Sequence, residues 1–131
     1  MLQRRRILVV DGSKYFNSPI WHTLIPESEF EIVGLACNND EALRMAATLC
    51  PDIVLVDLSH SEMRGVRVIW SLNAVQPAIP IIAFTPMSSN EYTRAALNAG
   101  AAACLPKSEM VDVLMQTIWD LVPDGLSFSR H

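Results

Sequence analysis

The sequence predicts an α/β fold, a doubly wound parallel sheet of five strands with helices on both faces. Short runs of β-branched residues alternate with longer amphipathic stretches, in repeating units of about 20–25 residues. Three of the runs are apolar at every position, which is typical of strands buried on both faces. Because parallel strands need crossover connections, the alternation indicates a sheet covered by helices on each side.

The five expected strands differ in how strongly the sequence marks them. The runs at residues 7–10, 53–56 and 79–84 are continuously apolar, and Pro80 must lie near the start of its strand because it cannot donate to a ladder. Residues 31–37 are weaker and resemble an edge strand, and residues 101–105 form a short fifth run. The sequence therefore predicts three inner strands and two weaker ones.

Helical patterns lie between these runs. We expect Asn39 to cap the helix that follows the second strand, and residues 64–75 to form the next. Ser88 and Glu91 form a capping box before residues 92–98, and Gly100 fits the residue that ends such a helix. Ser108 can cap a last helix that runs to residue 121.

The first helix, over residues 14–25, has two alternative descriptions. Pro19 either kinks the helix or takes its first position after a Ser18 cap.

Length and composition restrict the class of protein. The 131 residues predict one domain over residues 1–122 and a C-terminal tail or truncated linker over residues 123–131. No apolar run is long enough to span a membrane and no secretory signal is present, so we expect a cytoplasmic protein. The net charge of −4 is unfavourable for direct binding to nucleic acid, and residues 4–6, three arginines, are interpreted as a solubilising flank. We interpret the three cysteines, Cys37, Cys50 and Cys104, as small buried hydrophobic residues in a reducing compartment.

Four polar side chains follow four of the expected strands. Asp11, Asp57, Thr85 and Lys107 come at the carboxyl ends of the first, third, fourth and fifth strands, the edge where such sheets place their sites. This set suits transfer of a phosphoryl group to a carboxylate, which must be ionised and exposed in a pocket. Asp57 is the best nucleophile and Asp11 the best ligand for Mg²⁺, while Lys107 and Thr85 can contact phosphoryl oxygens.

The same residues carry a resemblance to a known family. The chain resembles the receiver domain of bacterial response regulators over about residues 5–122. This resemblance implies a flavodoxin-like (βα)₅ fold with strand order 2-1-3-4-5, phosphorylated on Asp57 by a sensor histidine kinase. Lys107 is followed by Ser108, and with residues 30–34 this is similar to receivers that precede a LuxR-type helix-turn-helix domain. The segments that carry the resemblance are residues 7–11, 51–57, 63–65, 80–85 and 99–107.

The acid pocket departs from the family pattern. Gly12 stands where the family has a second acidic residue after the first strand, so Mg²⁺ should be bound more weakly. The backbone carbonyl of Ser59 can still serve as a ligand. His60 and Glu62 are either solvated loop residues or groups that compensate for Gly12. Cys104 stands where the family often has an aromatic residue.

Two functions are therefore expected, and a third is disfavoured. The chain is either a phosphorylation switch that controls an output domain or partner, with transcription the expected output, or a pseudo-receiver that works without phosphorylation of Asp57. A nucleotide or flavin enzyme is disfavoured because the loop after the first strand lacks a glycine-rich phosphate motif. We expect no enzymatic activity of the chain itself, and DNA contact only through an output domain that these residues do not include.

The resemblance also implies a surface for partners. Receivers use the face formed by the fourth helix, fifth strand and fifth helix for dimerisation or output. Apolar residues on the two helices could form an exposed face there, and a homodimer through this face is expected. These residues are Tyr92, Ala95, Ala96, Met110, Val113 and Trp119.

Overall fold

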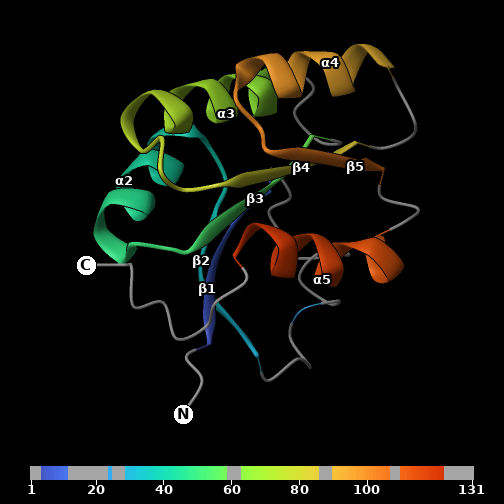
Figure 1. Ribbon diagram of the computed structural model, residues 1–131. Helices are drawn as coiled ribbons and strands as arrows, with labels where there is room; N and C mark the ends of the chain where they lie inside the picture. Colours follow the sequence, from blue (N-terminus) through green and yellow to red (C-terminus); the bar gives the residue numbers. More distant parts are fainter. Residues whose placement is uncertain are drawn as a thin grey trace.

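The computed structural model describes residues 4–11, 24, 29–58, 63–85, 90–106 and 110–122. Its centre is a parallel sheet of five strands in the order β2-β1-β3-β4-β5 (Figure 1). This order confirms the predicted doubly wound fold. The strands are β1 (Arg5–Val10), β2 (Phe30–Ala36), β3 (Ile53–Asp57), β4 (Ile81–Thr85) and β5 (Ala103–Pro106).

Four helices are described, and they cover both faces of the sheet. α2, α3 and α4 lie on one face, and α5 lies on the other (Figure 1). This division follows from strand order, because the chain winds in opposite directions from the central β1 and β3. The helices are α2 (Asn39–Leu49), α3 (Met63–Val75), α4 (Asn90–Ala99) and α5 (Met110–Leu121).

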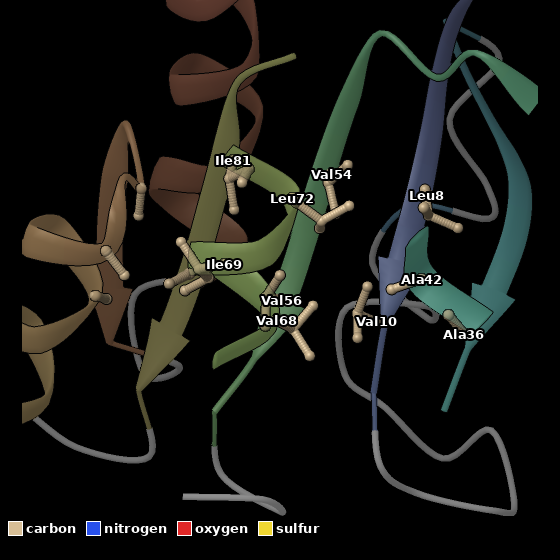
Figure 2. Close-up of a cluster of buried hydrophobic side chains, with 14 of the residues drawn as sticks. Leu8, Val10, Ala36, Ala42, Val54, Val56, Val68, Ile69, Leu72 and Ile81 are labelled. Atoms are coloured by element: carbon tan, nitrogen blue, oxygen red, sulfur yellow. The ribbon is translucent and has the colours of Figure 1, made fainter. Parts of the chain in front are cut away.

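Each face of the sheet has its own hydrophobic core. On one face, alternate residues of the strands, such as Leu8, Val54 and Val56, pack against α2 and α3, as Figure 2 shows. On the other, Ile7, Leu55 and Phe84 pack against Leu114 and Ile118 of α5. The side-chain period of two therefore explains why the inner strands are apolar throughout: every position faces one core or the other.

The helix boundaries differ from expectation at one cap. The N-cap of α2 is Asn38, whose Oδ1 accepts a hydrogen bond of 2.9 Å from the amide of Glu41, whereas Asn39 is already helical. The Glu41 side chain in turn accepts 2.8 Å from the amide of Cys37, which completes a reciprocal cap. Two adjacent asparagines both suit a cap, and only the position of Glu41 three residues after Asn38 distinguishes them.

Gly100 ends α4 as predicted. Its φ of +121° lies in a region that residues with a Cβ rarely adopt. The other expected cap residues, Ser88 and Ser108, lie outside the described residues, as do Pro19 and Ser18 of the first helix.

Two interpretations of polar residues were wrong. Cys37 and Cys50 are exposed and Cys104 is half-buried, because Cys37 follows an edge strand and Cys50 is the left-handed C-cap of α2. Arg5 is not a solvated flank residue but the first residue of β1, and it is buried. Among the described residues, no helix is both long and apolar enough to cross a membrane.

Candidate functional site

Asp11 and Asp57 meet at the carboxyl edge of the sheet. Val10 on β1 pairs with Val56 on β3, so the two aspartates are the next residues on neighbouring strands. Neighbouring strands lie about 4.8 Å apart, which places both backbones within reach of one small ligand. Asp11 lies four residues after Ile7, and Asp57 lies two residues after Leu55. Because side chains alternate between the two faces of a strand, both aspartates belong to the face of the sheet that α5 covers.

Backbone hydrogen bonds hold both aspartates in place. The amide of Asp11 donates 2.9 Å to the carbonyl of Ala36, and the amide of Leu58 donates 2.8 Å to the carbonyl of Phe84. Each ladder therefore continues up to or beyond its aspartate, and the two carboxylates are carried on rigid backbone rather than on free loop. This rigidity suits a site that must hold its groups in a fixed geometry.

Thr85 ends the strand next to that of Asp57. Asp57 pairs with Phe84, so Thr85 lies one position further along the edge, and it pairs with Pro106 on β5. Lys107, the residue after Pro106, lies outside the described residues, as do Gly12, Ser59, His60 and Glu62. The structure thus brings together three of the four predicted strand-end groups and says nothing of the fourth.

The burial of these groups differs from expectation. Asp11, Asp57 and Thr85 are only 2%, 1% and 1% exposed, although a phosphoacceptor was expected to be open to solvent. The physical reason is position: β3 and β1 are inner strands, flanked by neighbours on both sides. Each of these three residues also takes part in an interaction within the structure, as buried polar residues generally do.

The donor set is compatible with Mg²⁺ but small. Two carboxylates on neighbouring strands are hard oxygen ligands, and Mg²⁺ is commonly bound by one or two carboxylates while it keeps several waters. Within the described part of the chain, no group of three His, Cys, Asp or Glu side chains gathers as a metal site. The two carboxylates therefore fit Mg²⁺, and the weaker binding expected from Gly12 stays a prediction.

Cys104 lies beside the site on β5, where it contacts α4. Its Sγ lies 3.8 Å from Oγ1 of Thr93. Burial raises the pKa of the Cys104 thiol above its usual range, and the contact with Thr93 opposes this only in part. The side chain is therefore a neutral spacer between β5 and α4 at neutral pH.

The expected apolar face on α4 and α5 is only partly present. Ala96 is fully buried, and Trp119 is turned inward, where its ring packs against Phe30. Among the described residues, the exposed large apolar side chains are instead Leu97 of α4, at 45%, and Trp70 and Val75 of α3, at 65% and 60%. The helical period of 3.6 residues does not distinguish the buried side from the exposed side of α5, because most positions of this helix are apolar. The side chain of Met110 is outside the described residues.

A match to a family model decides the classification. The model for the response regulator receiver domain matches residues 7–119. The chain is a receiver domain of the response-regulator family. The observed strand order and the aspartates that end β1 and β3 agree with this assignment.

The relatives found by sequence are longer proteins that match this chain over part of their length. It is 34% identical over 136 residues to a protein-glutamate methylesterase/protein-glutamine glutaminase of Vibrio cholerae, covering 95% of this chain and 36% of the relative. A protein of the same description from Pseudoalteromonas atlantica is 36% identical over 104 residues, covering 78% of this chain and 27% of the relative. The chain thus spans about a third of the length of such relatives.

Solved structures support the fold of the receiver. A two-component response regulator of the LuxR family from Aurantimonas sp. superposes with a TM-score of 0.80 at 24% identity, covering 94% of this chain and 89% of the other. The response regulator domain of Thermotoga maritima CheB superposes with a TM-score of 0.73 at 19% identity, covering 93% and 96%. At these identities the likeness concerns the fold alone.

Proposed function

We propose that this receiver is a phosphorylation switch in which Asp57 accepts a phosphoryl group from a sensor histidine kinase. The observation that carries the proposal is the juxtaposition of Asp11 and Asp57, two buried carboxylates at the ends of neighbouring strands. A structural role does not require two carboxylates there, because packing alone would favour apolar side chains. The chain itself is proposed to be a switch and not an enzyme, and to act in the cytoplasm.

In the proposed transfer, an oxygen of Asp57 forms a bond to phosphorus while the bond from phosphorus to the donor nitrogen breaks. The leaving imidazole keeps the electron pair and takes up a proton. The hydroxyl of Thr85 donates a hydrogen bond to a phosphoryl oxygen, and the ammonium group of Lys107 neutralises part of the charge of the product.

Asp11, Asp57 and the backbone carbonyl of Ser59 would hold Mg²⁺. The ion, when bound, supplies positive charge to the transferring phosphoryl oxygens. Gly12 adds no carboxylate to this set of ligands. We therefore expect phosphorylation to need a higher Mg²⁺ concentration than in a pocket with a second acidic residue.

The output of the switch is proposed to be a domain or partner that contacts the face of α4, β5 and α5. Among the described side chains of these three elements, Leu97 of α4 is the large apolar one that is exposed. Resemblance to LuxR-type receivers favours transcription as the output, with a homodimer and DNA bound by the output domain, whereas the sequence relatives favour a methylesterase. The gene beyond the codon for His131 distinguishes them: it encodes a helix-turn-helix, a hydrolase domain, or neither.

The test is the intact mass of the protein after incubation with acetyl phosphate or phosphoramidate and Mg²⁺. We expect a gain of one phosphoryl group in the wild type and none in Asp57→Asn, which keeps the shape of the side chain. Uptake by Asp57→Asn would place the nucleophile elsewhere. Absence of uptake by the wild type, at high Mg²⁺ and also with histidine kinases of the same cell, would establish the alternative, a pseudo-receiver.

A further inference from the structure

A buried arginine lies at the opposite end of the sheet from the acid pocket. Arg5, the first residue of β1, is 2% exposed, although arginine is almost never fully buried without a partner. Asp11 lies six positions further along the chain, which corresponds to roughly 20 Å of strand. The proposed phosphorylation chemistry therefore does not account for its burial.

Two contacts of Arg5 converge on the end of α5. The guanidinium lies 3.7 Å from the centre of the Trp119 ring, and its Nε donates a hydrogen bond of 3.0 Å to the carbonyl of Val122. These groups are 114 and 117 residues away in sequence, so the contacts join the first strand of the receiver to its last helical turn. Phe30, at the start of β2, completes the cluster with its ring 6.0 Å from that of Trp119.

The end of α5 needs a cation that the helix does not supply. The last turn of a helix carries partial negative charge and carbonyl groups without helical partners. Residues 118–121 contain no basic side chain and include Asp120, so α5 has no favourable charge of its own there. The amide of Val122 donates a hydrogen bond of 2.8 Å to the carbonyl of Ile118 and so continues the helix by one bond. Arg5 binds the carbonyl of Val122 itself.

We propose that Arg5 is a latch that fixes the direction in which the chain leaves the receiver. The guanidinium stacks on the last turn of α5 and binds its final carbonyl, so residues beyond Val122 start from a point fixed to β1. Any change in α5 is then passed to the following segment as the motion of a rigid helix rather than lost in a frayed turn. This transmission rests on the proposed switch function, whereas the latch itself does not.

The neighbouring arginines show that this role is specific. Arg4 has an exposed side chain and donates 2.8 Å to the carbonyl of Phe30, and the amide of Arg6 donates 2.8 Å to Oδ2 of Asp52. These two hydrogen bonds lead to β2 and to Asp52, whereas the contacts of Arg5 described above lead to α5. Arg4→Met is therefore a matched control that changes the same residue type one position away.

The test is amide hydrogen exchange of the wild type, Arg5→Met and Arg4→Met. We expect the amides of residues 119–122 to exchange roughly ten- to a hundredfold faster in Arg5→Met, the loss expected for a hydrogen bond to a charged group. The amides of Val54 and Val56, in the central strand, should keep their protection, and Arg4→Met should leave residues 119–122 unchanged. Unchanged exchange at residues 119–122 in Arg5→Met, or an equal increase in every element, would overturn the latch.

A second variant covers the case in which Arg5→Met does not fold. Trp119→Leu removes the stacked ring and keeps the carbonyl of Val122, so it should give a smaller acceleration confined to the same residues. Phosphoryl uptake is measured on the same samples. We expect Arg5→Met to take up phosphate like the wild type, because Arg5 is far from Asp57. Failure of the wild type to take up phosphate refutes the switch and leaves the latch to be judged by exchange alone.

Discussion

Replacing Gly100 by alanine should destabilise the receiver by about 2–4 kcal/mol. The φ of Gly100 is +121°, and a residue with a Cβ in this region costs about 1–3 kcal/mol. An added Cβ would also lie 2.5 Å from Cγ, 2.6 Å from Nδ2 and 2.8 Å from Cβ of Asn73 on α3. Asn73 must therefore move, at a cost of about 1 kcal/mol, typical of a small overpacking strain.

The two contributions can be separated by a second substitution. Asn73→Ala removes Cγ and Nδ2 and leaves only the Cβ contact at 2.8 Å. The double variant Asn73→Ala/Gly100→Ala should therefore recover about 1 kcal/mol of the loss and retain the backbone part. Gly34→Ala is a matched control, because its nearest contact is the flexible end of Leu49 at 2.9 Å and no positive φ is involved. We expect it to cost less than half as much.

The assay is urea unfolding followed by circular dichroism, with thermal unfolding as a second measure. A loss of about 2–4 kcal/mol corresponds to a fall in Tm of roughly 6–20 °C for a chain of this size. A loss below about 0.5 kcal/mol in Gly100→Ala would refute the argument, because it would mean that α4 ends without the positive φ. Equal losses in the single and double variants would refute the steric part alone.

Three further predictions concern the pocket, the thiols and the cap of α2. Gly12→Asp should bind Mg²⁺ several-fold more tightly by isothermal calorimetry, and an unchanged affinity would mean that His60 or Glu62 already compensates. Cys104 should react with iodoacetamide more slowly than the exposed Cys37 at pH 8, because burial limits access to the Cys104 thiol and its raised pKa leaves less thiolate. Since this pKa is raised in the folded state, stability should fall as pH rises above about 8.5, the usual thiol value, and a Cys104→Ser variant should lack that component. Asn38→Ala should cost about 1 kcal/mol in urea unfolding, while Asn39→Ala should cost much less; equal losses would contradict the assignment of the cap.

The inner strands could be read from the chain because burial on both faces leaves a strong local signal, whereas their order was implied by the resemblance to receivers. Residues 7–10, 53–56 and 81–84 are apolar at every position, and all lie in the inner strands of the sheet. The placement of Asp11 and Asp57 followed from the same pattern, since each comes where an apolar run stops. Parallel strands then bring these ends to one edge without further information.

The depth of the site could not be read in the same way. The residue types of Asp57 and Thr85 indicate exposure, yet both side chains are buried because their strands are flanked on both sides. The exposure of Cys37 and the inward position of Trp119 were missed for a related reason. Both depend on which neighbours a side chain meets, and those neighbours come from distant parts of the sequence.

By itself the sequence determined the fold class and the edge of the sheet where its carboxylates gather, because hydrophobic periodicity and strand-end residues are local properties. Its motifs at those strand ends also carried the resemblance to receivers. Only the tertiary structure decided that Arg5 is buried against Trp119 and the carbonyl of Val122. Three successive arginines before a strand have the composition of a solvated flank. The contact that gives one of them a role joins residues more than a hundred positions apart, and only the packing of α5 on the sheet brings them together.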